Sequence, residues 1–182
     1  MAGSISVKDS RMYLQPIIKA FDIFLIYGFL GAPVKWVMKA GIGKIPFVGA
    51  ACKAAGFIFV DNSSPKAAAR SVLEAERILH KGASIAIFPE GARSETGKLA
   101  RFKKGAFQMA ADQHLQVVPI TLNGPFHVLP IGSLNLHRHP MEMVIHAPIT
   151  LPDEGVGMPK GLQSIADETK RIISEDLWEE FK

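Results

Sequence analysis

Residues 84–94 read Ser-Ile-Ala-Ile-Phe-Pro-Glu-Gly-Ala-Arg-Ser, an apolar run that ends in a turn. The run predicts a buried strand, and Pro89 with Gly91 predicts that the chain turns where this strand ends. Gly91 allows the backbone to approach a ligand closely, and the planar guanidinium of Arg93 is suited to phosphate. Glu90 can orient that guanidinium or hydrogen-bond a hydroxyl group. The same pattern also fits an ordinary strand-to-helix loop with one surface ion pair, so both interpretations stay open here.

Strand-like apolar runs alternate with helical patterns on both sides of this stretch. This alternation predicts one α/β domain over residues 1–182, with a largely parallel sheet flanked by helices. Pro65 suits the first position of a helix, and Ser64 is suited to cap it. We expect helices at 21–29, 46–55, 65–80, 104–114 and 162–181, and strands at 34–38, 57–60, 84–88, 117–122 and 141–146.

The composition favours an anionic partner. The chain has 182 residues, of which 48% are hydrophobic, and a mean hydropathy of +0.17, as expected of an oily soluble domain or one that sits on a membrane. The net charge of +4 suits phosphate substrates, acyl carriers or acidic lipid headgroups. No long basic run or basic–aromatic interleaving is present, so we expect no nucleic-acid partner. Cys52 is the only cysteine, so an internal disulfide is excluded, and we interpret it as a packing residue.

The sequence predicts neither a signal peptide nor a transmembrane helix. Residues 1–10 are polar, without the apolar core of a signal peptide. The longest apolar run, Ile23 to Val34, is too short to span a bilayer, so it predicts a core helix or an interfacial helix.

The stretch Phe88 to Ser94 resembles the third sequence block of the 1-acyl-sn-glycerol-3-phosphate acyltransferases, also called lysophosphatidic acid or glycerolipid acyltransferases. That block reads F-P-E-G-T-R-S, and only Ala92 departs from it. Gly56 to Asp61 resembles the second block, although Asn62 replaces the arginine that usually follows.

Two further segments are similar to the same family. Val118 to Ile120 resembles the fourth block, and Lys35 to Pro46 resembles the segment after the first helix. The ordered blocks cover residues 11–150 and imply the glycerolipid acyltransferase fold. The chain begins almost at the first block, so we expect it to be N-terminally truncated relative to the family. The resemblance implies a peripheral protein on the cytoplasmic face of the membrane.

The resemblance also implies a reaction and its participants. A fatty acyl group passes from acyl-CoA or acyl carrier protein to the sn-2 hydroxyl of lysophosphatidic acid, in phospholipid biosynthesis. Arg93 binds the acceptor phosphate, while Glu90 and the backbone N–H groups of Gly91 and Ala92 shape the acceptor pocket. No metal or organic cofactor is implied. The implied substrate-binding residues are Glu90, Gly91, Ala92, Arg93, Ser94, Lys39 and Lys104.

The first block of the family, N-H-x-S-x-x-D, is incomplete. Asp22 stands where its aspartate belongs, but Ile17 occupies the position of the histidine five residues earlier. In this motif the histidine is the general base, and the aspartate fixes its tautomer and stabilises its charged form. None of the six histidines of the chain has an aspartate five positions later. We therefore expect this chain, as written, to be impaired or inactive.

A frameshift would explain the missing histidine. Residues 15–20 can be encoded by CAA CCA ATC ATC AAA GCC, and reading two bases later gives Thr-Asn-His-Gln-Ser. One more residue before Phe21 and Asp22 completes N-H-Q-S-x-F-D. The alternative is that Ile17 is genuine and the protein is a noncatalytic, lysophospholipid-binding relative. A phosphate-ester hydrolase that uses Arg93 is a weaker alternative, because no nucleophile or metal cluster accompanies the arginine.

Overall fold

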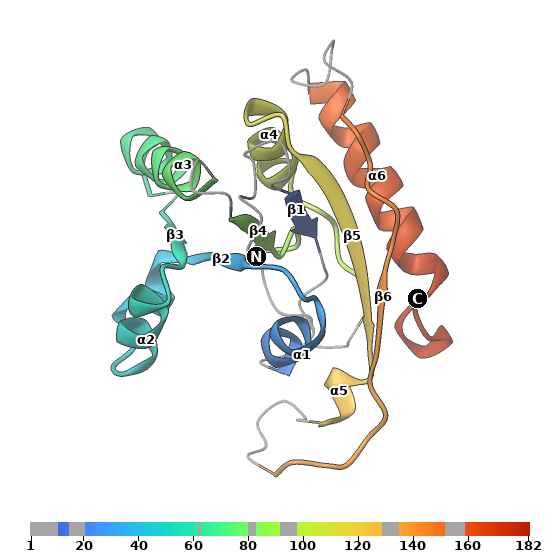
Figure 1. The fold of residues 1–182 in the computed structure, drawn as a ribbon. Coiled ribbons are helices and arrows are strands. Elements are labelled where there is room, and N and C mark those ends of the chain that lie inside the picture. Colours follow the sequence, from blue (N-terminus) through green and yellow to red (C-terminus); the bar gives the residue numbers. More distant parts are fainter. Residues whose placement is uncertain are drawn as a thin grey trace, which may run out of the picture.

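A six-stranded sheet forms the centre of the molecule (Figure 1). The computed structural model describes residues 11–14, 21–61, 63–79, 83–91, 98–128, 135–151 and 159–182. The strand order is β3-β2-β4-β1-β5-β6; the first five strands are parallel and β6 is antiparallel to β5. This confirms the predicted α/β class. The strands are β1 (Arg11–Leu14), β2 (Val34–Lys39), β3 (Ile58–Val60), β4 (Ser84–Ile87), β5 (Gln116–Asn123) and β6 (Glu142–Ile145).

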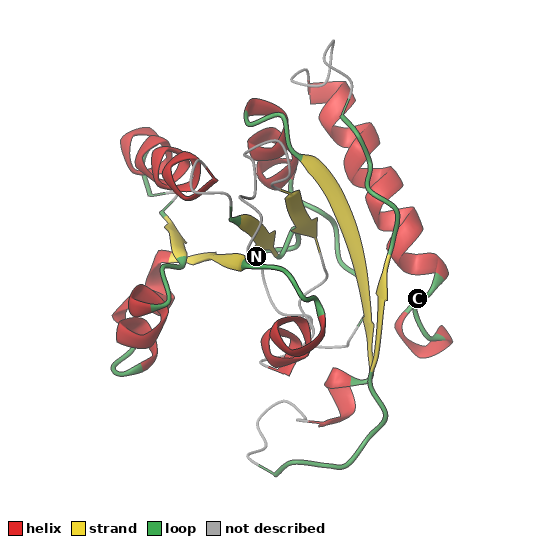
Figure 2. Ribbon diagram, in the orientation of Figure 1, coloured by secondary structure: helices red, strands yellow, loops and turns green. Residues whose placement is uncertain are grey.

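Helices cover both faces of the sheet (Figure 2). On one face lie α1 (Phe21–Phe29) and α2 (Val48–Ala54), with the 3-10 helix η2 (Ala40–Lys44) before α2. On the other face lie α3 (Pro65–Leu79), α4 (Lys104–Asp112) and α6 (Pro159–Glu175). The remaining elements are α5 (Pro125–Val128), after β5, and the 3-10 helix η3 (Glu179–Phe181), near the C-terminus.

Alternating side chains divide the interior into two apolar clusters. In β1, Met12 and Leu14 pack toward α3, α4 and α6, whereas Tyr13 packs toward α1. Trp36 is fully buried on the α1 side and stacks on Phe88, with ring centroids 5.0 Å apart. Both faces of the sheet are therefore buried, which explains why its strands read as nearly continuous apolar runs.

Most predicted elements occur, with boundaries shifted by a few residues. The expected cap of α3 is confirmed, because the Ala67 N–H donates to Ser64 Oγ at 3.2 Å. The expected helix at 46–55 begins only at Val48, because Phe47 adopts φ 61° and ψ −51° and the Val48 N–H donates to the Pro46 carbonyl at 2.7 Å. This hydrogen bond closes a γ-turn, which a helix cannot contain.

The expected C-terminal helix to residue 181 is wrong in extent, since α6 ends at Glu175. The reason is the buried side chain of Asn123 at the end of β5. Its amide donates to the Asp176 carbonyl at 2.8 Å, and its oxygen accepts the Trp178 N–H at 3.0 Å. These bonds take the place of helical ones, so the chain leaves the helix there. The strand β1 and the helices η2 and α5 were not predicted at all.

Among the described residues, no helix has the length and apolar character needed to cross a bilayer.

Candidate functional site

The candidate site lies at the carboxyl ends of β1 and β4, the two middle strands of the sheet. Leu14 of β1 is paired with Ile87 of β4, so the segments that follow both strands leave from the same edge. The connection after β1 runs through α1 on one face, and the connection after β4 runs through α4 on the other. Crevices outside the carboxyl ends of such diverging strands are the preferred ligand sites of open α/β sheets.

Asp22 is the acidic group at this edge. It lies in the first turn of α1, the helix that follows β1, and its side chain is fully buried. The first turn of a helix favours a negative charge, because the unpaired N–H groups there carry partial positive charge. A buried carboxyl group in this position is suited to accept a hydrogen bond from a neighbouring side chain and to fix the orientation of that side chain. The intended partner position, Ile17, lies in segment 15–20, outside the described residues.

Glu90 fixes the base of the loop that follows β4. It is 4% exposed, and its Oε2 accepts the backbone N–H of Ala100 at 2.9 Å. Beside it, the Lys103 N–H donates to the Pro89 carbonyl at 2.8 Å. These two bonds tie both ends of the loop together. The structure shows that the Glu90 carboxylate closes the base of the loop. That Glu90 also orients an arginine or binds a hydroxyl group stays a prediction.

Gly91 has φ +69°, a left-handed conformation that favours glycine. A Cβ atom at this position would lie 2.8 Å from Nζ of Lys103. The Lys103 ammonium therefore lies against the backbone of Gly91 at the start of the loop. The sequence analysis did not select Lys103, although its place just before α4, next to Lys104, was the available signal.

The other predicted residues divide into two groups. Lys39 ends β2, next to β4 at the same edge of the sheet, and is exposed. Lys104 is the first residue of α4, directly after Lys103. The remaining predicted positions, Ala92, Arg93, Ser94 and Asn62, lie outside the described residues.

His146 lies on the α6 side of the sheet, opposite α1. The hydroxyl of Thr121 donates to the Ile173 carbonyl at 3.0 Å, so Nε2 of His146, 2.8 Å from the same oxygen, must be the donor of their bond. Burial lowers the pKa of His146, while Asp176, 3.7 Å from Nδ1, acts in the opposite direction. This histidine holds α6 on the sheet and does not face Asp22.

A second histidine cluster is also structural. His127 lies 3.0 Å from Glu180, and its ring centroid is 4.5 Å from that of His139. Within the described ranges, no group of three His, Cys, Asp or Glu side chains could hold a metal ion.

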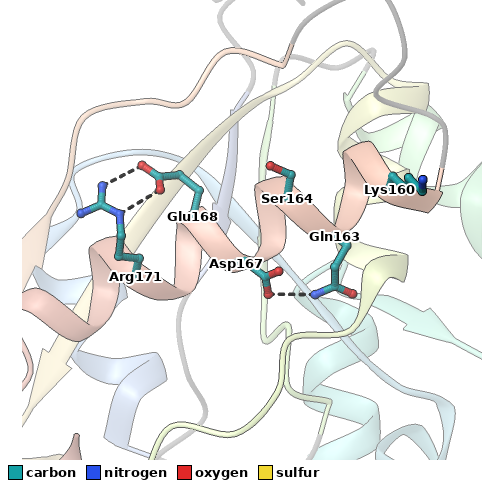
Figure 3. A pocket seen from close by; sticks show the side chains of 6 residues that line it. All are labelled: Lys160, Gln163, Ser164, Asp167, Glu168 and Arg171. Atoms are coloured by element: carbon teal, nitrogen blue, oxygen red, sulfur yellow. Dashed lines mark hydrogen bonds and ion pairs between the residues drawn. The ribbon is translucent and has the colours of Figure 1, made fainter.

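A shallow hollow on α6 is not part of this site (Figure 3). Its lining comes from α6 alone, and the side chains pair among themselves, Gln163 with Asp167 and Glu168 with Arg171. Such paired, exposed groups on one helix are typical of a solvated surface. We assign no ligand to it.

A family profile described as Acyltransferase matches residues 18–123 of this chain. The chain is 39% identical over 129 residues to the chloroplastic 1-acyl-sn-glycerol-3-phosphate acyltransferase LPAT1 of Arabidopsis thaliana, a match that covers 70% of this chain and 36% of the plant protein. It is 38% identical over 157 residues to the chloroplastic 1-acyl-sn-glycerol-3-phosphate acyltransferase BAT2 of Brassica napus, covering 86% of this chain and 43% of that protein. The chain thus spans less than half the length of these two relatives.

The fold is similar to a solved structure. The crystal structure of the 1-acyl-sn-glycerophosphate (LPA) acyltransferase PlsC from Thermotoga maritima superposes with a TM-score of 0.73 and 26% sequence identity. The superposition covers 96% of this chain and 69% of the other.

Proposed function

Because the chain belongs to the acyltransferase family, we propose that it is built to move a fatty acyl group onto lysophosphatidic acid. The donor is acyl-CoA or acyl carrier protein, and the acceptor is the sn-2 hydroxyl of 1-acyl-glycerol-3-phosphate, a step of phospholipid biosynthesis. The names of the plant and Thermotoga relatives support this acceptor. The proposal treats residues 1–182 as one acyltransferase domain, peripheral to the membrane on its cytoplasmic face.

The observation that carries the proposal is the position of Asp22. It is a fully buried carboxyl group at the start of α1, at the edge where the loop containing Glu90 also leaves the sheet. A buried carboxylate beside a histidine fixes the tautomer of the imidazole and stabilises its protonated form. The histidine removes the proton of the acceptor hydroxyl, and the hydroxyl oxygen attacks the thioester carbonyl. The thiolate of the donor then leaves and takes up a proton.

We propose that the acceptor phosphate binds at the loop that follows β4, where positively charged side chains gather. In our proposal Arg93 binds it with its planar guanidinium, and the N–H groups of Gly91 and Ala92 contribute hydrogen bonds. Glu90 supports this loop through Ala100, and the Lys103 ammonium against Gly91 adds positive charge. Lys39, Lys104 and Ser94 are further candidates for contact with substrate.

The sequence, however, has isoleucine at position 17, where the base belongs. A general base contributes roughly a hundred- to ten-thousand-fold to the rate, so we propose that this chain as written is impaired or inactive. Either a local double frameshift has replaced the histidine, or the protein is a noncatalytic relative that binds lysophospholipid.

Repair of the first block tests this proposal. The repaired chain carries Gln15→Thr, Pro16→Asn, Ile17→His, Ile18→Gln, Lys19→Ser and Ala20→Leu. We expect acyl transfer to a soluble short-chain acceptor, with a rate that rises through about pH 6–7 as the histidine loses its proton. Adding Asp22→Ala to the repaired chain should remove this activity.

Two results would decide against the frameshift account. One is a repaired, folded chain that binds both substrates and never transfers the acyl group. The other is a gene sequence over codons 14–22 whose bases, read two positions later, do not encode Thr-Asn-His-Gln-Ser. Turnover by the unrepaired chain at the repaired rate would instead refute the histidine–aspartate chemistry.

A further inference from the structure

The outer surface of α1 is unusually apolar for a helix that is exposed on one side. The helix reads Phe-Asp-Ile-Phe-Leu-Ile-Tyr-Gly-Phe, so after Asp22 it carries apolar or aromatic residues and one glycine on every side. Leu25 and Ile26 pack on the sheet, but Phe24 is 69% and Phe29 73% exposed. A helix that is apolar all round is normally covered on all sides. With nine residues, α1 is about 13 Å long, far short of a bilayer.

The segment that leads into α2 is also apolar and exposed. Ile45 and Val48 are about half exposed, and Phe47 is 90% exposed. The two helices lie on the same face of the sheet (Figure 1). Tyr27 of α1 stacks on Phe57, the residue just before β3. We call these exposed residues the α1–α2 face. It consists of Phe24, Tyr27, Phe29, Ile45, Phe47 and Val48.

Phe47 is held in its exposed position at a conformational cost. Its φ of 61° and ψ of −51° define a γ-turn that bulky residues rarely adopt. The Phe47 ring adds almost no buried apolar area to stabilise the fold, because it is nearly fully exposed to solvent. A strained backbone that presents an exposed aromatic ring indicates a role outside the folded domain.

The charge of this region identifies the kind of surface it fits. Residues 23–60 contain four lysines, Lys35, Lys39, Lys44 and Lys53, and no aspartate or glutamate; Asp61 follows directly, and its carboxylate interacts with the charge of Lys44. Lys44 and Lys53 are exposed beside Phe47 and along α2. Aromatic rings combined with an excess of lysines over acids match a bilayer with anionic headgroups, where rings enter the interface and lysines meet phosphates.

We propose that the α1–α2 face docks on the surface of an anionic lipid bilayer. The proposal deepens the proposed function, because it names the surface that meets the membrane from which a lipid acceptor comes. The docking face adjoins the candidate site: Asp22 lies in the first turn of α1, and η2 follows Lys39 at the same edge of the sheet. A lipid headgroup held at this face is therefore close to the edge where the reacting groups gather.

The test is co-flotation of the 182-residue chain with vesicles made of phosphatidylcholine and phosphatidylglycerol in roughly two-to-one proportion. We expect binding that weakens with added salt and is poorer on pure phosphatidylcholine. Phe47→Gly should lower vesicle affinity about tenfold, the value of one large apolar side chain at the interface. The thermal midpoint should not fall, since glycine relieves the γ-turn. Lys44→Glu with Lys53→Glu should lower affinity by at least about tenfold.

Matched controls lie on α3, on the opposite face of the sheet. Leu73 is 62% exposed there and Lys66 is exposed, so Leu73→Ser and Lys66→Glu should leave vesicle binding within about twofold of the parent chain. Equal losses in the α3 and α1–α2 variants would overturn the proposal. Sedimentation that shows a dimer, dissociated by Phe47→Gly, without vesicle binding would assign the face to a second copy and also overturn it.

The vesicles contain neither lysophospholipid nor acyl donor, so the outcome is independent of turnover. If a repaired chain acylates a soluble acceptor but does not bind vesicles, only the proposal of the docking face is contradicted. A chain that binds vesicles through this face and never acylates contradicts only the proposed reaction.

Discussion

Glu90→Ala should destabilise the protein, because it removes a buried hydrogen bond at the base of the loop after β4. The carboxylate is 4% exposed and accepts the Ala100 N–H at 2.9 Å, so it makes a buried, charge-assisted hydrogen bond. Such bonds contribute about 1.5–3 kcal/mol, and the variant also leaves the N–H of Ala100 without this acceptor. For a chain of this length, 1 kcal/mol lowers the thermal midpoint by about 2–4 °C. We therefore expect the midpoint to fall by roughly 4–10 °C.

Thermal and urea unfolding, followed by circular dichroism, measure this effect. Glu90→Gln keeps an acceptor oxygen and should lose less than half as much stability as Glu90→Ala. Glu74 supplies the control, because its carboxylate pairs with Arg77 at 2.6 Å but is 43% exposed. Glu74→Ala should change the free energy of unfolding by less than about 1 kcal/mol. If Glu90→Ala is as stable as Glu74→Ala, Glu90 does not hold the loop and our reasoning about the base of the site is refuted.

Three further perturbations test other parts of the molecule. Arg93→Ala should weaken binding of a lysophosphatidate acceptor by about 10- to 150-fold in calorimetry, with donor affinity unchanged, and Arg93→Lys should recover only part; equal loss of both affinities would make Arg93 structural. His146 has a lowered pKa in the folded state, so the unfolded chain takes up its proton first as the pH falls. The contribution of neutral His146 to the free energy of unfolding is complete above the pKa of the unfolded chain, about 6.5, and is lost as the pH falls below it. His146→Gln should therefore flatten the decline of the thermal midpoint between about pH 7 and 5. Identical slopes in the two proteins would contradict this. Gly124 has φ +93°, and a Cβ there would lie 2.0 Å from the Pro140 carbonyl oxygen, so Gly124→Ala should lower the free energy of unfolding by at least about 1–3 kcal/mol; a midpoint equal to that of the parent chain would show that the turn can relax.

The sequence was sufficient to predict five of the six strands, because these carry a local signal. Ser84 to Ile87 and Val117 to Leu122 are apolar runs that belong to strands buried on both faces, a pattern that local composition reveals. The strand β1 was not predicted, because its four residues, Arg-Met-Tyr-Leu, are too few to show a hydrophobic periodicity. Its pairing with Ile85 and Val117 is a tertiary property, set by strands far along the chain.

For the candidate site, sequence motifs located the segments but not the contacts. Asp22 and Glu90 were selected from their blocks, and both proved to be buried at one edge of the sheet. The bond from Ala100 to Glu90 and the packing of Lys103 on Gly91 could not be read from motifs. They arise because the loop folds back on itself, which depends on distances between residues ten or more positions apart. Whether Arg93 contacts phosphate stays a prediction.

The central place of β1 has a consequence for how the molecule is made. Among the described strands β1 is synthesised first, yet its neighbours in the sheet, β4 and β5, are synthesised much later. Until Asn123 at the end of β5 has been synthesised, the strand that leads to Asp22 lacks a partner on one side. The nascent chain therefore exposes unsatisfied strand edges during most of its synthesis, a state prone to mispairing. Asp22, the acid of our proposal, is therefore made early, whereas the strand that leads to it completes its pairing only when β5 has been made.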